Sequence, residues 1–61
     1  RIQELRKLAG MTQKQLSSES GVNIRTLQQY ENMSKDINKA SGIILASLAK
    51  ALRCSIEDLL Q

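Results

Sequence analysis

The scarcity of chain-breaking residues is the feature that most restricts the fold of this chain. Its 61 residues include no proline and three glycines, too few to separate the many short strands of a β-sandwich. Leu, Ile, Ala, Lys, Gln and Glu are instead frequent, and these residues favour helices. The sequence therefore predicts an all-α fold, with one small domain over residues 1–61.

Residues that catalyse reactions, bind metals or form disulfides are few. The chain has no histidine and one cysteine, Cys54, which excludes an intrachain disulfide and a Cys/His zinc site. We interpret Cys54 as a small core or boundary residue, and no grouped carboxylates offer a general base. We therefore expect no enzyme activity, no metal and no cofactor. The single cysteine fits a reducing cytoplasm, and no apolar run approaches the roughly 20 residues that span a bilayer. We therefore expect a cytoplasmic protein with no membrane contact.

Spacing and capping residues predict two short helices in the first third of the chain. A one-sided apolar stripe predicts a helix over about residues 1–9. Its members are Ile2, Leu5, Leu8 and Ala9. Thr12 and Gln15 form a capping-box pattern that should begin a second helix over about 13–20. That helix should end at Gly21, which can adopt the left-handed conformation.

Three further helices are expected, which makes a compact five-helix bundle. Asn23 should cap a third helix over 24–32, and residues 33–39 form a polar loop anchored by Ile37. Either Asn38 or Ser41 can cap a fourth helix, and Ser55 should cap a short fifth helix. The apolar positions of these last two helices are Leu45, Leu48, Ala49, Leu52, Ile56, Leu59 and Leu60.

The third helix has two opposed faces. Leu27 and Tyr30 point to one side. The other side carries one guanidinium, three amides and no carboxylate, on Ile24, Arg25, Gln28, Gln29 and Asn32. Arginine and amide side chains match the base edges of the major groove, although an ordinary solvated face explains the glutamines equally well. The charge favours a nucleic acid partner, because residues 1–39 carry seven Lys or Arg against four acids, whereas the charges of residues 40–61 cancel.

The order of these motifs resembles the phage repressor and Cro helix-turn-helix family, also described as xenobiotic-response-element-like bacterial regulators. The matching segments are Thr12 to Ser17, Gly21 to Asn23, Leu27, Tyr30 to Asn32, Leu48 to Leu52 and Ser55 to Leu60. The resemblance implies a lambda-repressor-like fold whose second and third helices form the helix-turn-helix. Ser17 should be small because the two helices cross closely there, and Gly21 should avoid a Cβ clash in the turn.

The resemblance also implies roles for individual residues. Base-reading positions fall on Asn23, Ile24, Arg25 and Gln29, to which the exposed face adds Gln28. Phosphate contacts fall on Gln13, Asn32, Lys35, Asn38 and Lys39, and Gln13 should also help to orient Arg25 or its neighbours. Ile24 can pack on a thymine methyl or cover the edge of the core. Arg6 and Glu31 should form a structural ion pair between the first and third helices.

Two features depart from the family pattern. Met33 stands where the family usually has a glycine, so the third helix should run on or end in a different cap. The following loop is about three residues longer than the common form.

The expected function is sequence-specific binding of double-stranded DNA by a bacterial or phage transcriptional regulator, most simply a repressor. Two copies should bind a palindromic operator as a homodimer. The resemblance places candidates for the dimer contact at Leu52, Arg53, Ile56 and Leu60. The alternative is a protein-interaction or antitoxin-type module with the same fold.

Overall fold

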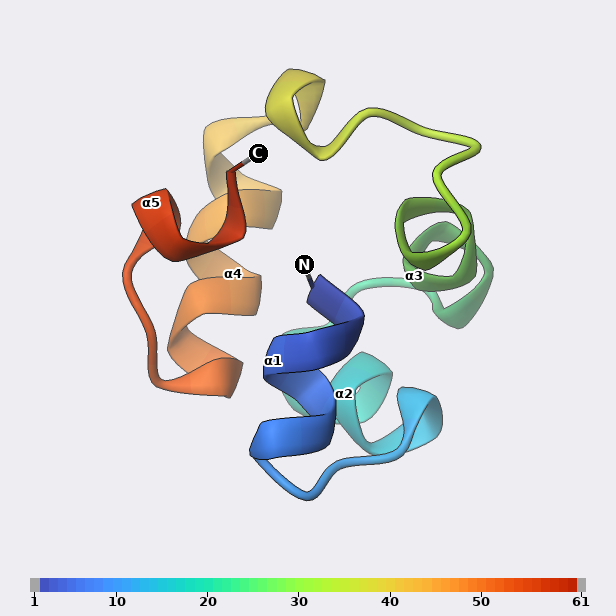
Figure 1. The fold of residues 1–61 in the computed structure, drawn as a ribbon, viewed down its shortest axis with the longest axis vertical. Coiled ribbons are helices and arrows are strands. Elements are labelled where there is room, and N and C mark those ends of the chain that lie inside the picture. Colours follow the sequence, from blue (N-terminus) through green and yellow to red (C-terminus); the bar gives the residue numbers. More distant parts are fainter. Residues whose placement is uncertain (1, 61) are drawn as a thin grey trace.

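The computed structural model describes residues 2–60, and this range contains helices and no strand. The elements are α1 (Ile2–Leu8), α2 (Gln13–Ser20), α3 (Ile24–Glu31), the 3₁₀ helix η1 (Ile37–Lys39), α4 (Gly42–Leu52) and α5 (Ile56–Leu59). Helix α2 packs against both α3 and α4, while α1 packs against α3 and α5 against α4. Figure 1 shows residues 33–41 crossing from the α3 side of the molecule to the α4 side. The predicted all-α fold is confirmed.

Local hydrogen bonds set the bounds of α2, which the sequence predicted correctly. The Gln15 amide donates to the Thr12 hydroxyl over 3.1 Å, and the Thr12 amide donates to Gln15 Oε1 over 2.8 Å. At the other end Gly21 has a left-handed φ of 75°. A Cβ at Gly21 would meet no atom within 4 Å, so the expected clash with the turn was wrong. Glycine is favoured at this position because the backbone there is left-handed, a conformation that strains residues with a Cβ.

The ends of α3 and α4 are also set by polar side chains. Asn23 caps α3, because its Oδ1 accepts from the Arg25 amide over 2.8 Å. Helix α3 ends at Glu31, one residue earlier than expected, and Asn32 is its C-cap. Ser41 caps α4, which decides between the two candidate caps, whereas Asn38 lies within η1.

The core is aliphatic apart from Tyr30. The residues with the largest fully buried side chains are Leu16, Leu27, Leu48 and Leu59. Ile37 is 3% exposed, which confirms it as the anchor of the loop.

The apolar stripe predicted for α1 was wrong at its last two positions, Leu8 and Ala9. Leu8 is 85% exposed, and Ala9 is exposed just beyond the end of the helix, whereas Arg6 is buried. At about 100° per residue, Arg6 lies about 40° around the helix from buried Ile2, but Leu8 lies about 120° away on the other side. Burial of Arg6 therefore turns Leu8 toward solvent. Arg1, which was expected within this helix, lies outside the described residues.

Met33, at the position where the resemblance leads one to expect a glycine, adopts a left-handed backbone conformation with a φ of 67°. Its side chain is 65% exposed, so a substitution removes little packing. The Met33→Gly variant should be more stable by about 0.5–1 kcal/mol, because the left-handed strain of a side chain exceeds the backbone entropy cost of glycine. Urea unfolding followed by circular dichroism measures the difference.

Ser34→Gly is the matched control for this prediction. Ser34 is exposed and is not among the positive-φ residues, so glycine there brings only the entropy cost and should lower stability slightly. A Met33→Gly variant that unfolds at lower urea than the parent would contradict the assigned strain.

Candidate nucleic-acid interface

The turn between α2 and α3 is held by hydroxyl groups at the end of α2. Ser17 Oγ donates to the Val22 carbonyl oxygen over 2.6 Å, and the Val22 amide donates to Ser20 Oγ over 3.1 Å. Val22 itself is buried. These bonds fix the direction in which α3 leaves the turn. Sequence analysis explained Ser17 by its size and missed its hydrogen bond, which joins residues across a non-helical turn.

The two faces of α3 are opposed in the structure. Leu27 is fully buried and Tyr30 is 6% exposed. The predicted base-reading residues Asn23, Ile24, Arg25 and Gln28 are exposed, as is Asn32, whereas Gln29 is half-buried. Ile24 is 37% exposed, so it lies at the boundary between the outer face and the core. The Oδ1 atom of Asn23 is engaged in capping, which leaves its amide nitrogen for other contacts.

Arg6 and Glu31 form the ion pair expected between α1 and α3. Arg6 Nε donates to Glu31 Oε2 over 2.8 Å, and Arg6 Nη2 donates to Glu31 Oε1 over 3.0 Å. Nη1 donates to the Met11 carbonyl oxygen over 2.8 Å. The two side chains are 10% and 4% exposed. The pair therefore ties both α1 and the α1–α2 connection to the end of α3.

Gln13, at the start of α2, connects this pair to the outer face of α3. Its Nε2 donates to Glu31 Oε1 over 3.2 Å, and its Oε1 accepts from Gln28 Nε2 over 3.4 Å. Gln13 was expected to help orient Arg25 or its neighbours, and the neighbour that it contacts is Gln28. Gln13, Gln28 and Glu31 line a hollow of about 360 Å³ together with Gln3 and Asn32. Gln3 was missed by sequence analysis, because no pattern within α1 distinguishes it from a solvated residue.

The loop after α3 carries the remaining predicted phosphate contacts. Lys35, Asn38 and Lys39 are exposed. Lys35 and Asn38 line a second hollow, of about 310 Å³, with the loop residues Met33, Asp36 and Ile37. Asp36 caps η1 by accepting from the Asn38 amide over 2.9 Å. This bond sets the backbone conformation next to Lys35 and Asn38.

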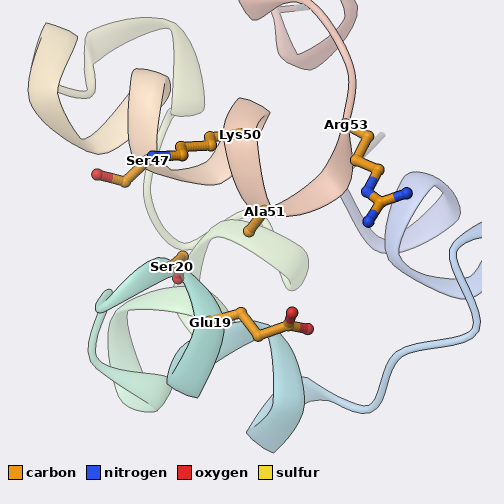
Figure 2. A pocket seen from close by; sticks show the side chains of 6 residues that line it. All are labelled: Glu19, Ser20, Ser47, Lys50, Ala51 and Arg53. Carbon is orange, nitrogen blue, oxygen red and sulfur yellow. The ribbon is translucent and has the colours of Figure 1, made fainter.

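A separate hollow lies between α2 and α4 and shares no residue with the two described above. Figure 2 shows the residues that line it, which are Glu19, Ser20, Ser47, Lys50, Ala51 and Arg53. Within residues 2–60, no group of three or more His, Cys, Asp or Glu side chains could hold a metal ion. No helix in the same range is long and apolar enough to cross a membrane.

Cys54 lies half-buried at the end of α4. Burial and the nearby Asp58 carboxylate raise the pKa of its thiol above the ordinary value. The thiol is therefore protonated at neutral pH and is a poor nucleophile. This agrees with the interpretation of Cys54 as a structural residue.

The candidates for a dimer contact divide into one core residue and three accessible ones. Leu52 is 8% exposed and belongs to the core, so its placement in a contact surface was wrong. It is the last residue of α4 and faces the other helices. Arg53 is exposed, and Ile56 and Leu60 are 38% and 37% exposed.

Comparison with known proteins identifies the family. A family model described as Helix-turn-helix matches residues 2–59, which include every element of the structure. No curated protein and no solved structure gave a match. Domains of the matching family bind DNA and are not typically enzymes. The chain therefore belongs to the phage repressor and Cro-type helix-turn-helix family of DNA-binding transcriptional regulators, with a lambda-repressor-like fold.

Proposed function

We propose that this chain is a single helix-turn-helix domain that binds specific double-stranded DNA sites, with α3 in the major groove, and acts as a cytoplasmic repressor. The outer face of α3 supports this proposal most directly. It exposes Arg25 and Gln28, and the one acid within α3, Glu31, is bound by Arg6. Such a face can approach DNA without repelling it, and its guanidinium and amide groups suit base edges.

Each residue predicted for this surface has a proposed contact. Base edges are assigned to Asn23, Ile24, Arg25, Gln28 and Gln29. Sugar-phosphate contacts are assigned to Gln13, Asn32, Lys35, Asn38 and Lys39. Ile24 is partly exposed at the start of α3, a position from which it can pack on a thymine methyl group.

Two copies are needed for a complete site. The part of the chain that the structure describes extends over 24 Å along its longest principal axis, which is shorter than the distance of about 34 Å between successive major grooves on one side of a duplex. A single chain therefore reaches one half-site. We propose a homodimer on a palindromic operator, with Arg53, Ile56 and Leu60 in its contact surface.

Selection from random duplex DNA, followed by a gel shift on the selected sequence, tests the proposal. A palindromic consensus is expected. Arg25→Ala should weaken binding to it about 5- to 150-fold for each copy bound, since a bidentate contact to guanine is worth about 1–3 kcal/mol. Arg25→Lys should keep the non-specific affinity and lose much of the discrimination, because lysine has no bidentate fork.

Circular dichroism should show that both Arg25 variants remain folded, because the Arg25 side chain is exposed. No enriched sequence, together with a tight complex with a protein, would instead favour an interaction or antitoxin-type module.

A further inference from the structure

Met33, at the start of the loop after α3, combines two features that do not favour the fold. Its backbone is left-handed, with a φ of 67°, a conformation that strains a residue with a Cβ. Its apolar side chain is 65% exposed, so it adds little to the core. Neither the backbone nor the packing thus favours a methionine here. Residues held in a strained backbone conformation are frequent where a protein contacts a ligand.

Backbone hydrogen bonds to α3 fix the position of this residue. The Met33 amide donates to the Tyr30 carbonyl oxygen over 3.4 Å, and the Lys35 amide donates to the Gln29 carbonyl oxygen over 3.1 Å. Both acceptors belong to the second half of α3. The start of the loop is therefore folded back on the end of α3, and Met33 is held at a set place beside the surface assigned to DNA.

The neighbours of the Met33 side chain include residues assigned to the DNA backbone. Met33 lines the hollow of about 310 Å³ together with Lys35 and Asn38, and it directly follows Asn32 in the chain. All three of these neighbours are exposed. Asp36 also lines this hollow, and its carboxylate caps η1. Phosphate and deoxyribose alternate along a DNA strand, so a side chain next to a phosphate contact lies near the carbon atoms of a sugar.

We propose that the Met33 thioether packs on a deoxyribose ring of the DNA backbone, beside the phosphate that Lys35 contacts. This inference rests on the proposed function and adds an apolar contact to it. A methionine side chain is unbranched and adapts to irregular surfaces, and the carbon face of the sugar removes its apolar surface from water. Every nucleotide carries this sugar, so the contact raises the affinity without reading sequence.

The two methionines of the chain allow a direct test with an internal control. In protein labelled with ¹³C at the methionine methyl groups, the Met33 methyl protons should show nuclear Overhauser contacts to deoxyribose protons of the selected duplex. Met11 is half-buried and packs against the core, so its methyl group should show none. A Met33 methyl group with no contact to sugar protons in the bound state would overturn the proposal.

Three variants separate the apolar contact from the backbone strain. Met33→Leu keeps an apolar side chain of similar volume and should bind the selected duplex within about twofold of the parent. Met33→Ala keeps the strain and loses most of the contact, so it should bind about 3- to 20-fold more weakly for each copy bound. Met33→Gly should weaken binding at least as much while it raises stability. A purely structural role would not move stability and affinity in opposite directions.

The salt dependence of binding distinguishes this contact from the phosphate contacts. Met33→Ala removes no cation, so its slope of log affinity against log salt should equal that of the parent. A lower slope in Met33→Ala would assign the loss to the lysines of the loop and overturn the proposal. Equal affinities of the parent and Met33→Ala would overturn the contact and leave the proposed function intact. A parent that binds no duplex DNA would overturn both.

Discussion

Replacing Arg6 with alanine should remove half or more of the free energy of unfolding of this domain. The substitution leaves the Glu31 carboxylate, 4% exposed, without its two guanidinium bonds, and leaves the Met11 carbonyl oxygen without its donor. Removing one partner of a buried pair costs about 3–5 kcal/mol. A domain of this length has roughly 3–9 kcal/mol of stability in total. Urea unfolding followed by circular dichroism at 222 nm measures the loss.

Two comparisons separate the ion pair from other effects of this substitution. Lys7→Ala, an exposed cation next to Arg6 in α1, should change stability by less than about 0.5 kcal/mol. Arg6→Met combined with Glu31→Leu should recover much of the loss, because no buried charge is left unpaired. An Arg6→Ala variant that unfolds like the parent would show that the pair contributes nothing to stability.

Binding to the selected DNA site should weaken about 10³- to 10⁵-fold between 50 and 200 mM salt, if the dimer makes 6–10 phosphate contacts. The physical cause is the release of condensed counterions when cations of the protein neutralise phosphates. Lys35 and Lys39 are the exposed cations of the loop after α3. Fluorescence anisotropy titrations of labelled duplex at several salt concentrations give the slope of log affinity against log salt.

Matched lysine variants locate the phosphate contacts. Lys35→Ala should lower the salt slope by about one for each copy bound, and so by about two for a dimer. Lys50→Ala removes an exposed lysine from the hollow between α2 and α4 and should leave the slope unchanged. Equal slopes for both variants, or a nearly flat salt dependence of the parent, would contradict the assignment of the loop to the DNA backbone.

Elements whose ends are set by neighbouring residues could be predicted from the sequence. The Thr12 and Gln15 capping box gave the start of α2, and Ser55 gave the start of α5, where its hydroxyl accepts from the Asp58 amide. Both patterns act over three residues, so the tertiary structure is not needed to recognise them. The opposed faces of α3 were predictable for the same reason, since helical periodicity places Leu27 and Tyr30 together.

Features that depend on distant partners could not be predicted from local patterns. The exposure of Leu8 follows from the burial of Arg6, whose carboxylate partner lies 25 positions along the chain. The ion pair was expected only through the resemblance to a family. The left-handed conformations of Met33 and Arg53 have no local signal, because neither residue type favours that region.

The residues of the candidate surface were predicted from the sequence, but the contacts between those residues were not. Gln13 and Gln28 were expected on phosphate and base, respectively, yet their mutual hydrogen bond depends on how α2 and α3 cross. Gln3 joins the same hollow from α1, which only the packing of α1 against α3 reveals. The contacts of this surface with DNA therefore remain predictions for the variants described above.

The position of Tyr30 gives the chain an internal optical reporter. The sequence contains no Trp or Phe, so its near-ultraviolet absorption and its fluorescence come mainly from one phenol ring. That ring is 6% exposed, on the core side of α3. Detachment of α3 from the rest of the molecule would hydrate the ring and alter its emission. The packing of α3 against the rest of the molecule can thus be followed by the emission of Tyr30 in unlabelled protein. This signal is separate from the loss of total helix content.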